Sequence, residues 1–207
     1  MNKNITAIVD YGVGNIFSLK SSLAIIGANA VVTDSADVLS SAARIILPGV
    51  GAFEDAIGKL SSSGLDKTII SCADNGKPLL GICLGMQMLF DRSYEYGEHK
   101  GLGLIPGAVV PLKERLNNDL KVPHIGWNKL DYLADDALFK YLNGDAYAYY
   151  VHSYYAETSD EYIIARSEYG ISVTGAVRNK NVFGTQFHPE KSGNQGLLML
   201  KAFCEEV

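Results

Sequence analysis

Short apolar runs alternate with amphipathic segments through the first half of the chain. The run at residues 5–9 ends at Asp10 and a glycine-bearing turn, which predicts a strand. Asn15 then stands at a helix N-cap position, and apolar side chains recur on one helical face until Gly27, which predicts a helix. Those side chains are Ile16, Leu19, Leu23 and Ile26. Further strands are expected at residues 29–33, 44–47 and 78–82, with room for crossover helices between them, and another helix is expected over residues 84–90.

The second half of the chain is richer in strands, separated by clusters of Gly, Asn and Asp. Strands are predicted at residues 108–110, 147–151, 162–166, 173–177 and 182–187, followed by an amphipathic helix over residues 195–205. No repeat or linker divides the chain. The pattern therefore predicts a single α/β domain, residues 1–207, with a doubly wound, mixed and mostly parallel sheet flanked by helices.

Composition narrows the function classes. Hydrophobic residues make up 47% of the 207 residues, which supports a packed core. The net charge of -5 gives no basic footprint, so neither nucleic acid nor an anionic membrane surface is an expected partner. The apolar runs are too short to span a bilayer, and the N-terminal segment shows no apolar core of a signal peptide. We therefore expect a cytoplasmic protein. The three cysteines show no CxxC spacing, so no disulfide scaffold or metal site is expected.

The segment Gly81-Ile82-Cys83-Leu84-Gly85 lies between a predicted buried strand and a predicted helix. This strand-turn-helix context is that of a nucleophile elbow, in which flanking glycines let the neighbouring chain approach closely. The Cys83 sulfur would sit near the positive end of the helix, which favours a thiolate, and the N–H of Leu84 would point toward an oxyanion. The bland alternative is a buried core cysteine at the end of a strand.

A cysteine nucleophile needs a base, and the base needs an orienting acceptor. His188 and Glu190, at the end of the last predicted strand, offer both groups two residues apart. His152 is the rival base and His124 is a weaker one. An exposed His and Glu in an ordinary turn is the alternative interpretation.

Two glycine-rich segments are candidates for a role in binding. Gly49-Val50-Gly51 follows a predicted strand, and such a backbone can present N–H groups to a developing oxyanion, although an ordinary strand-to-helix turn would look the same. Gly12-Val13-Gly14-Asn15 suggests a dinucleotide site, but Phe17 stands where the third glycine of that motif belongs, which excludes this interpretation.

The order Cys83, His188, Glu190 resembles the class I, triad-type glutamine amidotransferases. The segment 81–87 resembles the nucleophile motif of that family and 188–190 its base-and-acid motif. Within the class, the chain is most similar to the glutaminase subunits of imidazole glycerol phosphate synthases. The similar segments run along the whole chain and comprise residues 10–15, 48–51, 123–128, 149–154 and 187–193.

The resemblance implies an activity and a set of roles. Cys83 would attack the side-chain amide of glutamine, His188 would shuttle the proton, and Glu190 would orient the imidazole. The oxyanion would be met by Leu84 N–H and, after a backbone rearrangement, by Gly49-Val50-Gly51. No cofactor is implied. The positions carried over for holding glutamine are Gln87, Glu95, Ser153 and Tyr154.

The resemblance also implies a partner, because free ammonia is mostly protonated in neutral water and must travel along a dry path. In the family, a (β/α)8-barrel cyclase subunit receives the ammonia and makes imidazole glycerol phosphate and aminoimidazole carboxamide ribotide in histidine biosynthesis. A heterodimer is therefore expected. Residues similar to those of the interface or tunnel mouth are Asn15, Trp127, Tyr149 and Lys191.

Two other functions stay open at this point. A paralogous glutaminase would use the same catalytic residues to supply ammonia to a different synthase, such as a sugar-amidating enzyme. A catalytically silent regulatory subunit would keep only the interface, and the intact set of Cys83, His188 and Glu190 argues against it.

Overall fold

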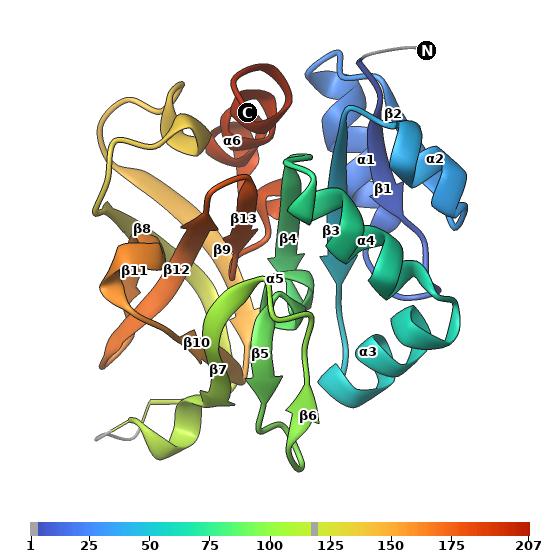
Figure 1. Cartoon of the computed structure of the whole chain (residues 1–207). Coiled ribbons are helices and arrows are strands. Elements are labelled where there is room, and N and C mark those ends of the chain that lie inside the picture. The colour runs from blue at the N-terminus through green and yellow to red at the C-terminus, as the bar shows by residue number, and fades with distance from the viewer. Residues whose placement is uncertain (1–3, 117–119) are drawn as a thin grey trace.

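The computed structural model describes residues 4–116 and 120–207, and within them two β-sheets form the frame. The larger sheet has nine strands in the order β2-β1-β3-β4-β13-β12-β11-β8-β9 (Figure 1). Its parallel half consists of β1 (Thr6–Val9), β2 (Ala30–Thr33), β3 (Arg44–Gly49), β4 (Leu79–Cys83) and β13 (Val182–Thr185). Its antiparallel half consists of β12 (Ser172–Asn179), β11 (Ile163–Glu168), β8 (His124–Tyr132) and β9 (Ala146–His152). The predicted mixed α/β sheet is confirmed.

Helices cover the parallel half on both faces. On β1, Ile8 points to one face and Ala7 and Val9 to the other, as expected where both faces of a strand are buried. The Ile8 face packs against α1 (Ile16–Ile25) and α6 (Gly193–Glu205). The opposite face packs against α2 (Ala36–Ser41), α3 (Phe53–Ser62) and α4 (Leu65–Asp74). This arrangement leaves the carboxyl ends of the parallel strands open for a site.

A second sheet, which the sequence pattern did not predict, lies below the nine-stranded sheet in Figure 1. Its order is β10-β7-β5-β6, formed by β10 (Tyr154–Glu157), β7 (Ile105–Pro111), β5 (Phe90–Ser93) and β6 (His99–Lys100). The strand predicted at residues 108–110 belongs here, within β7. Because β10 follows β9 after a single residue, Ser153, the chain passes from one sheet to the other at that point.

Several predicted boundaries are wrong. The helix expected over residues 84–90 is the short α5 (Leu84–Met88), because Phe90 is fully buried and begins β5. Strand β8 was missed altogether. Short 3-10 helices complete the chain at Leu112–Glu114, Ala137–Phe139, Asp160–Tyr162 and Pro189–Lys191.

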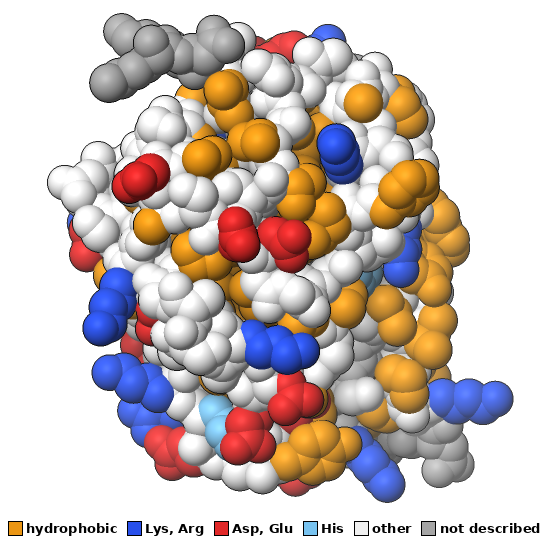
Figure 2. Space-filling model, turned by 90° about the vertical axis from the view of Figure 1, so that its right-hand side faces the viewer, with side chains coloured by type: hydrophobic (Ala, Val, Ile, Leu, Met, Phe, Trp, Pro, Cys, Tyr) orange, Lys and Arg blue, Asp and Glu red, His pale blue; other side chains and the backbone are white. Residues whose placement is uncertain are grey.

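The surface of one side of the molecule is mixed in character. Figure 2 shows acidic and basic side chains interspersed among hydrophobic and polar ones on that side, so no field of a single sign dominates it. None of the helices in residues 4–116 and 120–207 combines the length and apolar character needed to cross a bilayer.

Candidate active site

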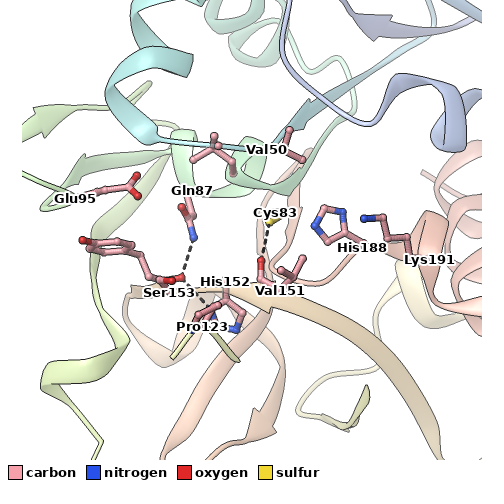
Figure 3. A pocket seen from close by; sticks show the side chains of 13 residues that line it. Val50, Cys83, Gln87, Glu95, Pro123, Val151, His152, Ser153, His188 and Lys191 are labelled. Carbon is pink, nitrogen blue, oxygen red and sulfur yellow. Dashed lines mark hydrogen bonds between the residues drawn. The ribbon is translucent and has the colours of Figure 1, made fainter. Parts of the chain in front are cut away.

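A cavity of about 430 Å³ opens where β4 and β9 end (Figure 3). It gathers many of the residues that the sequence singled out, from segments far apart in the chain. They are Val50, Gly51, Cys83, Leu84, Gln87, Glu95, Ser153, Tyr154, His188 and Lys191. Pro123, Val151 and His152 complete the lining.

Cys83 stands at a strained turn between β4 and α5, with φ 56° and ψ -110°. Such a positive φ is costly for a residue with a side chain and persists only when the surroundings impose it. Three glycines impose it by close backbone approach. A Cβ on Gly85 would lie 1.9 Å from the Leu47 oxygen, and one on Gly49 would lie 2.6 Å from the Gly85 nitrogen. A Cβ on Gly81 would lie 2.7 Å from the Gly85 oxygen. The predicted elbow is therefore present in the backbone.

The Cys83 sulfur has two polar neighbours across the cavity. As a thiol it donates to the carbonyl oxygen of Val151 at 3.9 Å, and Gln186 Nε2 donates to it at 3.8 Å. Sequence reasoning gave neither residue a role. Because the chain bends at residues 186 and 187, after β13 ends, the spacing of Gln186 and His188 did not indicate that both would face Cys83. A backbone carbonyl such as that of Val151 leaves no trace in the sequence.

His188 and Glu190 form a buried pair beside the cysteine. The Nδ1 of His188 lies 2.8 Å from Glu190 Oε1, and the two side chains are only 2% and 3% exposed. The Nε2 of His188 is buried and makes no hydrogen bond to any described residue. Burial lowers the pKa of His188, but interaction with the Cys83 sulfur and with Glu190 outweighs burial and raises it to about 9. The imidazole is thus poised as a cation next to the sulfur, with one nitrogen free.

In the rival bases, each ring nitrogen lies within hydrogen-bond distance of another polar atom. His152 Nδ1 lies 2.9 Å from the carbonyl oxygen of Tyr154, and His152 Nε2 lies 2.9 Å from His124 Nδ1. His124 Nε2 in turn lies 3.0 Å from Asn128 Oδ1. Of the three candidates, His188 alone therefore has a ring nitrogen with no hydrogen-bond partner in reach among the described residues.

The four residues expected to hold glutamine lie along one side of the cavity. Gln87 Nε2 donates to the Tyr154 carbonyl at 2.9 Å and to Gln186 Oε1 at 3.0 Å. Glu95 Oε2 accepts from the backbone N–H of Phe53 at 2.6 Å, at the start of α3. Burial raises the pKa of Glu95, partly offset by that hydrogen bond and by His99. Ser153 links β9 to β10, and Tyr154 is the first residue of β10.

The glycine segment expected to meet the oxyanion lies beside the elbow. Gly49 pairs with Cys83 between β3 and β4, and Val50 and Gly51 reach the cavity. Just before the segment, the Pro48 carbonyl accepts a hydrogen bond of 2.8 Å from the hydroxyl of Tyr11, a buried residue that sequence reasoning did not select.

Of the four candidate interface residues, Lys191 alone lines this cavity. The rings of Trp127 and Tyr149 meet edge to face at 6.0 Å, and Lys191 Nζ lies 5.9 Å from the Tyr149 ring centre. Trp127 is 54% exposed, which excludes a core role for it. Asn15 occupies the N-cap position of α1 without a side-chain capping bond, and lines a narrow crevice with His188. No group of three or more His, Cys, Asp or Glu side chains in the described part is arranged to hold a metal ion.

The sequence and structure are similar to those of known proteins. Residues 7–207 match the family model "Glutamine amidotransferase class-I". The imidazole glycerol phosphate synthase subunit HisH of Listeria monocytogenes serotype 4a (strain HCC23) is 49% identical over 96% of this chain and 94% of its own length. The HisH subunit of Methanothermobacter thermautotrophicus is 46% identical over 97% of this chain and 98% of its own.

Solved structures agree on the fold. The structure of PurLQS from Thermotoga maritima has a TM-score of 0.75 at 21% identity, covering 96% of both chains. A structure described as a glutamine amidotransferase has a TM-score of 0.73 at 19% identity, covering 95% of this chain and 98% of that one. With a family match over nearly its whole length and relatives at almost half identity, the chain belongs to the class I glutamine amidotransferases.

Proposed function

We propose that this chain is the glutaminase subunit of an imidazole glycerol phosphate synthase. The observation that carries the proposal is the strained Cys83 beside a buried His188 whose free Nε2 faces the cavity and whose Nδ1 is held by Glu190. The names of the relatives at 46% to 49% identity support the choice of synthase.

The chemistry follows from these positions. With His188 as an imidazolium at neutral pH, Cys83 is favoured as a thiolate, which attacks the amide carbon of glutamine. The carbonyl oxygen becomes an oxyanion, stabilised by Leu84 N–H and by the segment Gly49–Gly51. When the C–N bond breaks, His188 gives its proton to the departing ammonia.

The second half of the reaction frees the enzyme. Neutral His188 takes a proton from water as the water attacks the thioester, and glutamate leaves with restoration of the thiolate and imidazolium. Glu190 keeps the imidazole in one orientation through both halves. The polar side of the cavity, with Gln87 and the half-buried carboxylate of Glu95, would hold the backbone groups of glutamine.

A barrel cyclase is the partner that we propose. Ammonia released into neutral water is mostly protonated, so transfer requires a closed path from the cavity to the acceptor. Trp127 and Ile125, exposed by 54% and 58% on β8, offer apolar surface near the cavity, as interfaces do. Together with Asn15, Tyr149 and Lys191 they would surround the mouth of that path.

The test is glutamate release from glutamine by the purified chain, alone and with a (β/α)8-barrel cyclase and its ribonucleotide ligand. We expect little release alone and a large rise with the liganded cyclase. Release that ignores the cyclase would support the glutaminase chemistry and reject this partner, leaving a paralogous synthase. Silence in every condition, with cyclase binding demonstrated, would reject the enzyme in favour of a regulatory subunit.

The identity of the base has its own test. His188→Ala should lower glutamate release by about 10³-fold, because it removes the unpartnered imidazole that lines the cavity with Cys83. His152→Ala should cost far less. The reverse order would make His152 the base.

A further inference from the structure

The proposed chemistry does not use two buried histidines, His152, which lines the cavity, and its neighbour His124. His124 on β8 and His152 on β9 are directly opposite each other in the antiparallel ladder. A single line of hydrogen-bond contacts joins them, from the Tyr154 carbonyl through His152 and His124 to Asn128 Oδ1, with lengths of 2.9, 2.9 and 3.0 Å.

Both ends of this line are acceptors. A backbone carbonyl cannot donate, and Asn128 presents its oxygen because its Nδ2 donates to the Glu168 carbonyl at 2.6 Å. Three contacts need three protons, but two neutral imidazoles carry only two. Burial, together with the neighbouring His124, lowers the pKa of His152 to about 3, and burial also lowers the pKa of His124, so the pair is neutral at pH 7.

The neutral pair must leave one contact unmade, and burial decides which. His152 is 6% exposed and His124 is 0% exposed, whereas Asn128 is only partly buried, so the least costly contact to lose is the one at Asn128. Both histidines then carry their proton on Nδ1. His152 donates to Tyr154, and His124 donates to His152.

The carbonyl that His152 holds belongs to the cavity wall. Tyr154 O also accepts from Gln87 Nε2, and one residue before His152 the Val151 carbonyl accepts from the Cys83 sulfur. We propose that His124 and His152 are positioning residues, which fix the wall from Val151 to Tyr154 against the bound glutamine through this directed pair of hydrogen bonds. The inference rests on the proposed glutaminase function.

A purely structural role is the competing explanation, because the His124 ring is stacked between Tyr169 and Tyr150, with centroids at 3.9 and 4.9 Å. Two substitutions separate the explanations. His124→Phe keeps a flat ring between the tyrosines but cannot donate to His152. His124→Asn loses the ring but places an amide N–H at the position of Nδ1.

The measurement is steady-state glutaminase kinetics with the cyclase present, beside thermal unfolding of each variant. If the pair positions the wall, His124→Phe raises KM about fivefold to tenfold with kcat within about twofold, and His124→Asn stays closer to the unmodified chain although it unfolds at a lower temperature. A Phe variant that matches the unmodified chain while the Asn variant fails would overturn the inference.

A second readout does not depend on activity. Nitrogen NMR of the full chain labelled with 15N-histidine at pH 7 should show His152 and His124 protonated on Nδ1 and bare on Nε2. A proton on Nε2 of His152 would overturn the inference even in an active enzyme. An inactive unmodified chain with the expected tautomers would instead reject the proposed function and retain the hydrogen-bond arrangement.

Discussion

The two halves of the nine-stranded sheet build their parts of the cavity by different means. In the parallel half, Cys83 is placed by backbone packed against backbone, with Gly85 touching the Leu47 carbonyl at a distance that no side chain could enter. Where the antiparallel half ends and the chain passes from β9 to β10, the wall from Val151 to Tyr154 is placed by side-chain hydrogen bonds, from Gln87 and His152 to the Tyr154 carbonyl.

The two kinds of support differ in how much displacement of the backbone they tolerate. Close-packed backbone cannot yield by a few tenths of an ångström without disturbing two strands, so the position of the nucleophile is fixed once the fold forms. A wall held by a few hydrogen bonds, each worth about 1 kcal/mol net, can be loosened one bond at a time. Substitutions at the elbow should therefore destabilise the fold or abolish catalysis. Substitutions at the wall should weaken substrate binding by small steps.

The largest expected effect is the loss of the nucleophile. Cys83→Ala should reduce glutamate release by at least about 10⁴-fold and leave the fold and cyclase binding intact, since both neighbouring glycines are kept. Cys72→Ala, which removes another buried cysteine on α4, is the matched control and should retain activity. Glutamate assays of both variants decide the matter, and near-normal release from Cys83→Ala would remove the nucleophile assignment.

The second-largest effect is expected on stability, from a substitution at a glycine of the elbow. Gly85→Ala should lower the free energy of unfolding by about 3 kcal/mol or more, because its Cβ would meet the Leu47 oxygen at 1.9 Å. Gly58→Ala, at an exposed position of α3 with open space around it, should be neutral or stabilise by about 0.5–1 kcal/mol. Urea unfolding measures both. Equal stability of the two variants would mean that the close approach at Gly85 does not constrain the elbow.

The sequence predicts all the strands of the parallel half, and in the antiparallel half it predicts β9, β11 and β12 but not β8. In the parallel half, strands such as residues 44–47 read as continuous apolar runs because both faces are buried, and the elbow glycines mark the turn after β4. In the antiparallel half, β8 alternates exposed and half-buried positions and carries Gly126 and Asn128, so it has no strand-like apolar pattern. That strand, and with it the exposed face of Trp127, emerged only from its pairing with β9.

The same limit applies within the cavity. Cys83, His188 and Glu190 could be selected because their side chains are chemically distinctive and their motifs are local. The contacts of Gln186 and of the Val151 carbonyl with Cys83 join positions 103 and 68 residues apart, and only tertiary packing creates them. The roles assigned to all these residues stay predictions until the variants are measured.

The raised pKa of His188 should make the free energy of unfolding depend on pH. Burial opposes the charge of His188, but Cys83 and Glu190 raise its pKa to about 9, above the ordinary 6.5. The native state therefore holds a proton that the unfolded chain releases, and this stabilisation is fully present below pH 6.5 and disappears as the pH rises through about 9. We expect the free energy of unfolding to fall by on the order of 2 kcal/mol over that range.

The control for this slope is His188→Gln, which cannot titrate. Urea unfolding at pH 6.5 and 9.5 should show a smaller decrease in that variant than in the unmodified chain. Parallel decreases in the two proteins would assign the slope to other groups and would contradict the raised pKa.

The smallest effect is expected for a side-chain hydrogen bond in the parallel half of the sheet, close to the elbow. Tyr11 donates to the Pro48 carbonyl, immediately before Gly49–Gly51, and burial raises the pKa of its hydroxyl, which therefore stays protonated and able to donate. Tyr11→Phe removes that one bond and keeps the buried ring. We expect kcat for glutamine hydrolysis to fall about fivefold with KM unchanged, because the segment contacts the oxyanion only in the transition state.

Tyr155→Phe, which loses a hydroxyl bond to Glu157 from an equally buried ring, is the matched control and should leave both constants unchanged. A rise in kcat would show that Tyr11 restrains the segment in an unproductive conformation. A rise in KM alone would show that the segment takes part in substrate binding. Side-chain hydrogen bonds would then tune ground-state affinity in both halves of the sheet.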